Sequence, residues 1–323
     1  MVKIQSHKPG DLLARSPTSI MDLDLDVIYI ILSSLPRRDL VRLMNTCRTF
    51  NRAGVQHLLS FEDLSVYYPT FQSELVQFPR MRKLSVYEAD PPPALIALIF
   101  PNLMDLTVYG LDRVKDPRSP EDYQYRQQNL SVQLAGGGFT SLDRLAGGPL
   151  DLYRLGLTCQ VRCVDIFRVD CDTHDMVAYI LSNSRPSHVI IAFIAISPSC
   201  VRCFPDEVAV RLTYLQCTID YMSFDGISDA FDTFYLLLQH SPLTHLKLYF
   251  TTGFSKRVPT NFLEESRPEA FASQIIASHP SIRYIAVGIN DTERLFWKVT
   301  TAEDGEIVVD KAPEEDISVV MEP

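Results

Sequence analysis

The sequence has no long hydrophobic run. No apolar stretch in its 323 residues approaches the ~18 residues of a membrane-spanning helix. Residues 1–19 also lack the apolar core, about 7 to 15 residues long, of a secretory signal peptide. We therefore expect no membrane partner and a location in the cytoplasm or the nucleus.

Cysteines are few and odd in number, seven in a chain too long to need disulfide bonds for stability. Without a signal peptide they are expected to be reduced thiols that behave as small apolar residues. Cys200 and Cys203 form a lone CxxC pair, whereas a structural zinc site needs four ligands. One four-ligand set is available, but a strand-like run interrupts it: Cys159, Cys163, Cys171 and His174. We expect no bound metal and no cofactor.

Catalytic signatures are also missing. The sequence has no nucleophile elbow, no phosphate loop, no HExxH and no GxGxxG. The run Gly136-Gly137-Gly138 has no evident strand and helix around it and is interpreted as a flexible loop. These absences predict a protein that is not an enzyme, with a metal-dependent or thiol enzyme as an alternative.

Basic residues are outnumbered, because 30 lysines and arginines face 40 acids for a net charge of −10. The excess is local: residues 303–323 hold eight acids and one base, and the preceding 302 residues hold 32 acids and 29 bases. Binding to nucleic acid relies on clustered basic residues that release counterions. We therefore expect no nucleic-acid partner, a nearly neutral body and an acidic tail.

Two or three short amphipathic helices are predicted between residues 23 and 50. Apolar residues recur there at helical spacing, in two sets: Val27, Ile28, Ile31, Leu32 and Leu35, then Leu40, Leu43, Met44, Cys47 and Phe50. Asp24 and Asp26 suit the start of the first helix, and Pro36 ends it. So small a piece cannot bury its own apolar faces, so it must pack on the following domain as a cap or bind a partner.

The segment resembles an F-box. The resemblance rests on the order and spacing of twelve residues: Leu23, Val27, Ile31, Leu32, Leu35, Pro36, Asp39, Leu40, Leu43, Cys47, Arg48 and Phe50. It implies docking to a Skp-type adaptor of a cullin ubiquitin ligase core. By that resemblance the adaptor-binding residues are Leu23, Leu35, Pro36, Leu40 and Leu43. The family's opening Leu-Pro is Leu23-Asp24 here, which bears on the strength of adaptor binding.

A six-residue pattern, apolar-x-x-apolar-x-apolar, recurs through the body and is often followed by an aromatic residue. Clear copies begin at Phe61, Met81, Leu103, Val161, Leu243 and Ile282, with a weaker copy at Leu212. Their spacing leaves room for hidden units near Leu130–Leu134 and His188–Ile194. Leu152/Leu155/Leu157 also matches, but it lies too close to Val161 for both to be full repeats. About nine units are predicted.

Helical patterns alternate with the later strands. They carry Met176/Val177/Ile180/Leu181 after a cap at Asp172 or Thr173, Ile227 to Leu238, and Phe271/Ile275/Ile276 after Pro268. Alternation favours parallel strands with helices on one side. The body resembles a leucine-rich-repeat solenoid, although the usual Asn or Cys ladder is absent or replaced. An ordinary α/β domain is the alternative.

The end of the chain is predicted to cap this solenoid. Two apolar runs, residues 295–299 and 307–309, flank an Asp-Gly hairpin signal. Trp297, the sole tryptophan, is expected in the core. The predicted fold is α/β, divided into a flexible lead-in (1–20), an F-box-like helical module (21–60), an irregular leucine-rich-repeat-like solenoid with helices on its outer face (61–300), and an acidic hairpin and tail (301–323).

Two other segments stand out. Residues 112–128 are the longest polar stretch before the tail and are expected to be a solvated, partly disordered insertion, or alternatively a recognition loop. Pro91-Pro92-Pro93 is interpreted as a rigid connection between strands.

The leading hypothesis is a substrate receptor, which holds the ligase core through the F-box and an unknown target protein through the solenoid. Rate enhancement then comes from proximity. The alternative is a repeat-protein scaffold whose N-terminal helices only cap the stack and which has no ligase role.

Overall fold

The computed structural model describes most of the body of the chain and little of its first 62 residues. The described residues are 35, 39, 42–43, 63–67, 77–87, 92–110, 119–194, 198–220, 235, 238, 241–251, 268–289, 293–301 and 307–313. The chain divides into two compact units, residues 1–61 and residues 62–323. The elements below belong to the second unit.

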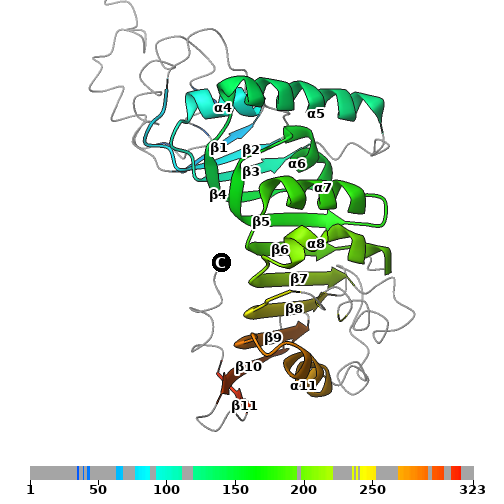
Figure 1. Ribbon diagram of the computed structural model, residues 1–323. Helices are drawn as coiled ribbons and strands as arrows, with labels where there is room; N and C mark the ends of the chain where they lie inside the picture. The colour runs from blue at the N-terminus through cyan, green and yellow to red at the C-terminus, as the bar shows by residue number, and fades with distance from the viewer. Residues whose placement is uncertain are drawn as a thin grey trace, which may run out of the picture. The chain divides into compact units, whose positions relative to one another are not determined.

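The second unit is built on one sheet whose strands follow one another in chain order (Figure 1). The described residues form eleven strands: β1 (Asp63–Tyr67), β2 (Lys83–Tyr87), β3 (Asp105–Tyr109), β4 (Ser141–Gly147), β5 (Gln160–Val169), β6 (His188–Phe193), β7 (Tyr214–Asp220), β8 (His245–Thr251), β9 (Tyr284–Ile289), β10 (Glu293–Thr301) and β11 (Ile307–Lys311). Strands β1 to β9 are parallel to their neighbours, and β10 and β11 run antiparallel.

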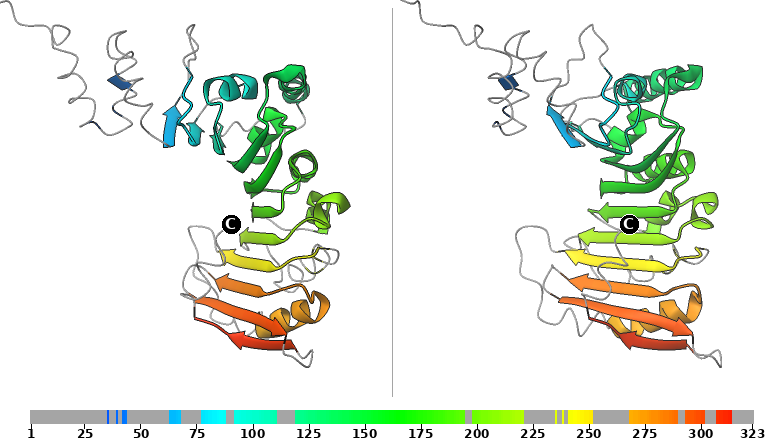
Figure 2. Two further views of the ribbon diagram at one scale, coloured as in Figure 1. Left: turned by 60° about the vertical axis from the view of Figure 1, so that its left-hand side comes forward. Right: turned by 90° about the vertical axis from the view of Figure 1, so that its left-hand side faces the viewer.

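Helices occupy one face of this sheet, as the two turned views show (Figure 2). They are α4 (Pro93–Ile99), α5 (Pro120–Val132) with a π-helical end η2 (Gln133–Gly137), α6 (Pro149–Leu155), α7 (His174–Ser184), η3 (Pro198–Cys203), α8 (Asp206–Ala209) and α11 (Pro268–Ser278). The fold is therefore α/β, as predicted. We call the opposite side of the sheet the open face.

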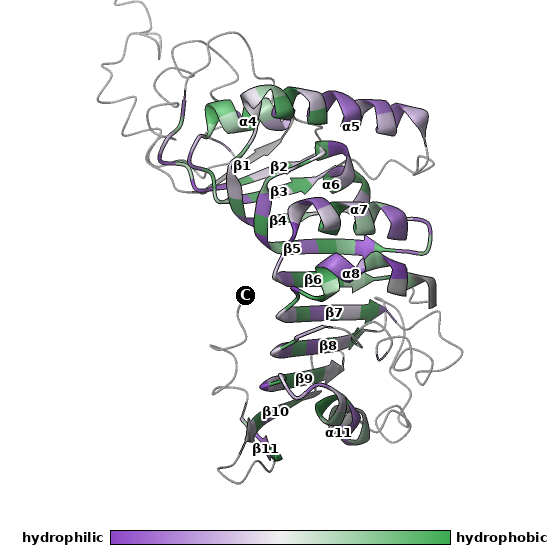
Figure 3. Cartoon of the chain, viewed as in Figure 1, coloured by the Kyte–Doolittle hydropathy of each residue, from purple (hydrophilic) through white to green (hydrophobic). Residues whose placement is uncertain are grey.

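The sheet is held in register by two rows of apolar side chains that point toward the helices. The first row crosses the sheet strand by strand: Leu84, Leu106, Leu145, Val164, Val189, Leu215, Leu246 and Ile285. Each is at most 1% exposed. These are the second apolar positions of the six-residue pattern, which the structure confirms for β2, β3, β5, β7, β8 and β9 and for the hidden unit at β6. The alternation is visible along the strands in Figure 3.

The other hidden unit was placed wrongly. Residues 130–134 lie in α5 and η2, where Leu134 is 72% exposed, and the strand is β4. Gly147 takes the third apolar position in β4 and hides the pattern. A Cβ there would lie 2.6 Å from Leu152 of α6 and 2.9 Å from the carbonyl oxygen of Val108, so only glycine fits this close approach of helix and strand. The Leu152/Leu155 match belongs to α6 and not to a strand.

The polar stretch 112–128 is not a disordered insertion where it is described, because α5 begins at Pro120. Ser119 caps it by accepting a hydrogen bond from the Glu121 amide at 3.2 Å. The helix is among the most hydrophilic in Figure 3, yet it packs on α6 through buried polar groups. Asp122 is fully buried and accepts a 2.8 Å hydrogen bond from Nε of Arg154, whose Nη2 forms an ion pair with the same carboxylate oxygen.

Two further side chains, one in α5 and one at the start of η2, satisfy the carboxyl end of α6. Asn129 donates to the carbonyl oxygen of Arg154 at 2.8 Å, and Gln133 donates to those of Leu155 and Gly156 at 3.0 Å each. Gly156 ends α6 with a φ of +57°, a left-handed conformation that favours glycine. The last carbonyls of a helix have no partner within it, so α5 acts as their cap.

Arg126 completes this polar interface. Its guanidinium carbon lies 3.6 Å from the ring centroid of Tyr179 in α7 and 4.7 Å from that of Tyr153 in α6. Its Nη1 also donates to the Tyr153 hydroxyl at 2.8 Å. One cation on α5 thus joins three helices through cation–π contacts.

Several smaller expectations can be compared with the structure. Pro93 is the first residue of α4, so the proline run leads into a helix. Gly136 and Gly137 belong to η2 and not to a loop, and Gly136 has a φ of +102° inside it. Helices α7 and α11 and the β10–β11 hairpin lie where they were predicted, and Trp297 is 5% exposed. Thr173 is the N-cap residue of α7, but its hydroxyl oxygen accepts a hydrogen bond from the amide of Asp170 and none from the helix. The predicted helix 227–238 is described only at residues 235 and 238, which are helical.

We expect Asp122→Ala to lower the free energy of unfolding by about 3 kcal/mol, because Arg154 would keep a buried charge without its partner. Urea unfolding followed by circular dichroism measures the change. The double variant Asp122→Leu/Arg154→Leu removes both charges and should be more stable than the single variant. Equal or greater stability of Asp122→Ala relative to the parent would contradict a structural role for the pair.

Candidate interaction surface

The open face carries three rows of side chains that alternate with the buried apolar rows. Row one contains Lys83, Asp105, Arg144, Cys163, His188, Tyr214, His245 and Tyr284, in β2 to β9. Row two, two residues further along each strand, contains Ser85, Thr107, Ala146, Asp165, Ile190, Gln216, Lys247 and Ala286. Row three lies two residues further again, at the carboxyl ends of the strands, and begins with Tyr87 in β2 and Tyr109 in β3. Since no described helix covers this face, it is the natural interaction surface of the sheet.

Oppositely charged side chains neutralise one another on β2 to β5. Lys83 Nζ lies 3.4 Å from a carboxylate oxygen of Asp105, and Arg144 Nη2 lies 2.5 Å from one of Asp165. These pairs join neighbouring strands or rows and leave little net charge on this half of the face. Because their side chains are partly exposed, solvent screening limits their contribution to stability.

Row three begins with three stacked aromatic rings. The ring centroids of Tyr87 and Tyr109 are 4.7 Å apart, and those of Tyr109 and Phe167 are 5.3 Å apart. The second contact spans from β3 to β5. It is possible because the residue that follows β4 is Gly148, which has no side chain to separate the rings. The result is a flat aromatic strip at the carboxyl ends of the strands.

Histidine and tyrosine rings alternate in row one from β6 to β9. His188, Tyr214, His245 and Tyr284 follow one another with ring centroids 5.5, 6.1 and 5.1 Å apart. Tyr214 is 2% exposed, whereas the other three are half-buried. The rings therefore form a continuous ladder. In this ladder His188, His245 and Tyr284 are partly open to solvent, and Tyr214 is not.

Hydroxyl groups hold the histidines of this ladder. Thr244 donates its hydroxyl proton to the carbonyl oxygen of Thr213 at 2.9 Å, and its Oγ1 lies 2.8 Å from Nδ1 of His245. Because that hydroxyl proton is already used, Nδ1 of His245 is the donor of the second bond and Nε2 carries the lone pair. Ser187 makes the equivalent 2.8 Å contact with His188.

Both histidines favour the neutral form. Burial lowers the pKa of His188 below its usual 6.5, and nearby Arg162 lowers it further. Burial also lowers the pKa of His245, with added repulsion from His188 and Lys247. Asp143 partly offsets the effect on His188 by favouring its charged form.

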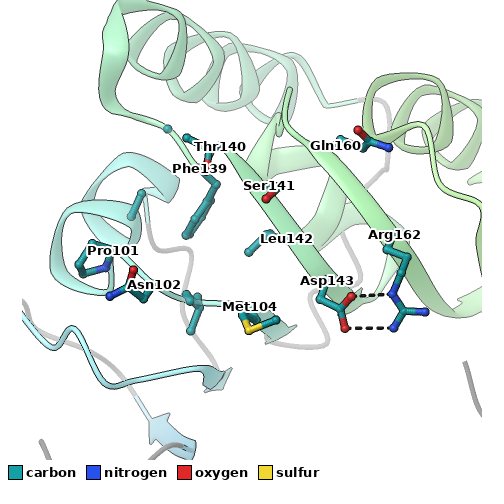
Figure 4. A pocket seen from close by; sticks show the side chains of 13 residues that line it. Pro101, Asn102, Met104, Phe139, Thr140, Ser141, Leu142, Asp143, Gln160 and Arg162 are labelled. Carbon is teal, nitrogen blue, oxygen red and sulfur yellow. Dashed lines mark hydrogen bonds and ion pairs between the residues drawn. The ribbon is translucent and has the colours of Figure 1, made fainter.

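A pocket of about 620 Å³ opens at the amino ends of β3, β4 and β5 (Figure 4). Phe139 and Met104 lie at its centre, and Met104 is 47% exposed. At one end Arg162 makes a two-point ion pair with Asp143, through Nε at 2.5 Å and Nη2 at 3.0 Å. The hydrogen bond from Arg162 is the main cause of the lowered pKa of Asp143. Apolar residues flanked by polar ones suit a side chain of a bound peptide.

The buried thiols of Cys159, Cys163 and Cys217 are poor nucleophiles. Six cysteines are free, and five of them are buried. Burial raises the pKa of Cys159 and Cys163 to about 11 each and that of Cys217 well above its usual value. A thiol held in its protonated form does not act as a nucleophile near neutral pH. Within the described ranges, no three His, Cys, Asp or Glu side chains gather as metal ligands would, so Cys159, Cys163, Cys171 and His174 are not brought together.

The residues predicted to bind an adaptor lie in the first unit. Leu35 and Leu43 are half-buried, whereas Leu23, Pro36 and Leu40 lie outside the described residues. Residues 39, 42 and 43 are helical, and the exposed side chains of Asp39 and Arg42 form an ion pair at 3.5 Å.

Comparison with known proteins decides what this unit is. A family model described as the F-box domain matches residues 20–55. The chain carries an F-box domain. F-box domains bind Skp-type adaptors in cullin ubiquitin ligases, and F-box proteins are typically adaptors rather than enzymes. The domain thus indicates a general role in substrate recognition by an SCF-type ligase. A search of curated proteins finds no match to the chain. Among the described residues of this F-box protein, none of the helices combines the length and apolar character of a membrane span.

Sequence reasoning identified the aromatic residues of row three but missed row one. Its members differ in chemistry, from Lys83 to His245, so no repeated residue type marks them. Their position was nevertheless readable, because each stands one residue before the second apolar position of the pattern. The pocket was also missed, since its lining comes from segments that only folding brings together.

The lowered histidine pKa values predict a loss of stability in mild acid. The pKa values of His188 and His245 are lower in the folded protein than in the unfolded chain, so the unfolded chain binds more protons at pH values near and below 6.5. The free energy of unfolding should therefore fall as the pH drops from 7.5 to 5.5. Urea midpoints across this range measure it. The variant His188→Gln/His245→Gln should show a flatter profile, whatever its absolute stability. An unchanged slope would show that other groups cause the dependence.

Proposed function

We propose that this F-box protein is a substrate receptor of a Skp/cullin/F-box ubiquitin ligase. The observation that carries the proposal is the F-box match at residues 20–55. The adaptor-binding residues are those implied by the F-box resemblance, Leu23, Leu35, Pro36, Leu40 and Leu43. Catalysis then belongs to the partners, and the receptor increases the rate by holding the target near the ligase core.

The target is held by the open face of the second unit. We interpret the sheet as a degenerate leucine-rich-repeat-like solenoid, in which each of nine parallel strands pairs only with its chain neighbours. The aromatic strip and the His/Tyr ladder support this assignment, because they present rings on a face of the sheet that no described helix covers. A rigid scaffold of this kind presents binding residues at fixed spacing.

This function places the protein in the cytoplasm or the nucleus, where the ligase works. The free cysteines agree with a reducing compartment. The protonated buried thiols and the absence of a metal-ligand group on the described residues weigh against the alternative of a thiol or metal-dependent enzyme.

Adaptor binding can be tested with Leu35→Asp/Leu40→Asp. Two carboxylates in an apolar interface would be desolvated without partners, so we expect co-purification with a Skp-type adaptor to fall by at least about tenfold. Leu134→Asp is the matched control, since this leucine is 72% exposed in the second unit. Failure of the unaltered protein to bind any Skp-type adaptor would overturn the ligase role.

The alternative function, a scaffold whose N-terminal helices only cap the stack, gives a different outcome on truncation. Deletion of residues 1–61, the first compact unit, should leave the second unit folded if the F-box is a docking module. A cap is needed for stability, so its removal would unfold the body. Circular dichroism and the thermal midpoint of residues 62–323 distinguish the two functions.

A further inference from the structure

Three consecutive apolar residues lie exposed on the last strand of the sheet. Strand β11 ends the strand order, and among the described strands it pairs only with β10 (Figure 1). All five of its residues are exposed, and the exposed fraction is 42% for Ile307, 37% for Val308 and 42% for Val309. Edge strands usually carry charges, prolines or bulges that prevent pairing with another chain. An apolar edge of this kind therefore indicates a surface for strand pairing.

The backbone groups that β11 offers at its outer edge follow from its bonds to β10. The Ala312 amide donates to the carbonyl oxygen of Phe296 at 3.1 Å. In an antiparallel pair, residues that bond to the neighbouring strand alternate with residues whose N–H and C=O groups point away from it. Ile307, Val309 and Lys311 stand at the alternate positions, so their N–H and C=O groups point toward the outer edge.

The side chains of β11 divide between the two faces of the sheet. Lys311 Nζ lies 3.3 Å from Oε1 of Glu269 in α11, which places Lys311 on the face that carries the helices. Ala312, the next residue, packs instead against the cluster that includes Ala286 of row two on the open face. Because successive residues alternate, the helix side of β11 holds Ile307, Val309 and Lys311, and the open face holds Val308 and Asp310.

A second copy of β11 fits this edge in an antiparallel register centred on Val309. Val309 then lies opposite Val309 of the second copy, and Ile307 lies opposite Lys311, so every outward N–H and C=O of the strand has a partner. Pro313 stands at the next outward position and has no N–H, so the bonded stretch ends before it. No like charges stand directly opposite each other in this register. Since Glu269 holds the charge of Lys311, the aliphatic stem of that lysine is left to cover Ile307 of the second copy.

We propose that two copies of the chain associate through β11, paired antiparallel about a two-fold axis that passes through Val309 and is perpendicular to the sheet. The contact is self-complementary, as a two-fold interface requires. Rotation about this axis keeps the faces of the sheet, so the open faces of both copies lie on the same side of one continuous sheet. A target that repeats its recognised segment is then held at two places, which raises its apparent affinity. The inference does not depend on the ligase role.

The test measures the molar mass of the full chain by sedimentation equilibrium as a function of concentration. The parent should approach twice the 36.6 kDa of one chain. Val309→Lys places two ammonium groups opposite each other at the axis and should weaken association at least about tenfold. Val210→Lys is the matched control, because Val210 is 59% exposed and lies outside this strand, and it should associate like the parent.

A charge-exchange experiment tests the register itself. Val309→Glu alone should weaken association as Val309→Lys does, because two carboxylates would then meet at the axis. An equimolar mixture of the two variants should recover the dimer, since each pair then brings opposite charges together. If Val309→Lys does not fold by circular dichroism, Val309→Pro replaces it, because it removes an outward N–H and leaves the bonds to β10, and it should also weaken association.

Four outcomes would overturn the inference. They are a parent that stays monomeric at about 100 µM, a dimer that the substitutions at Val309 leave unchanged, a mixture of the lysine and glutamate variants that stays monomeric, and a dimer that forms only after removal of residues 314–323. In the last case the chain's own tail is the occupant of the edge. Adaptor co-purification is scored on the same preparations, and a monomeric parent that binds the adaptor defeats this inference alone.

Discussion

The structure of the second unit depends on one constraint, the burial of two apolar side chains from each parallel strand in step with its neighbours. Leu106, Val164 and Leu246 are each fully buried in the same row although they come from distant parts of the chain. A shift of one residue would move these side chains to the other face of the sheet. The same burial brings the described helices to one face, and none of them covers the other face.

The polar helix α5 is positioned by polar and cation–π contacts rather than by apolar burial. It lacks a clear apolar stripe, and it is positioned by the Asp122–Arg154 ion pair, by the capping of α6 and by the contacts of Arg126 with tyrosines. Buried ion pairs contribute little net stability, but an incorrect partner leaves a charge unsatisfied. We interpret this network as the feature that specifies where α5 packs.

The two halves of the open face differ in the side chains that they present. Paired charges such as Arg144–Asp165 leave the first half nearly neutral, so its aromatic strip favours apolar contacts. The pocket around Met104, at the amino ends of β3, β4 and β5, also favours apolar contacts. The second half carries the histidine and tyrosine rings of the ladder, with Lys247 5.8 Å from the ring centroid of Tyr214. The acidity of the whole chain hides this difference, because most of the net charge lies after residue 302.

The sequence by itself determined the F-box, the α/β class, most strands and the final hairpin, because apolar spacing and turn residues are local signals. It misplaced β4, where Gly147 replaces an apolar residue, and it missed α5, whose buried face is polar. Tertiary structure decided these points, and also the rows on the open face. Gly147 is required in part by the close approach of the Val108 carbonyl in β3, Asp122 is neutralised by Arg154, and His188 meets Tyr214 only through strand register. Such contacts depend on distances between segments, which a pattern of neighbouring residues does not contain.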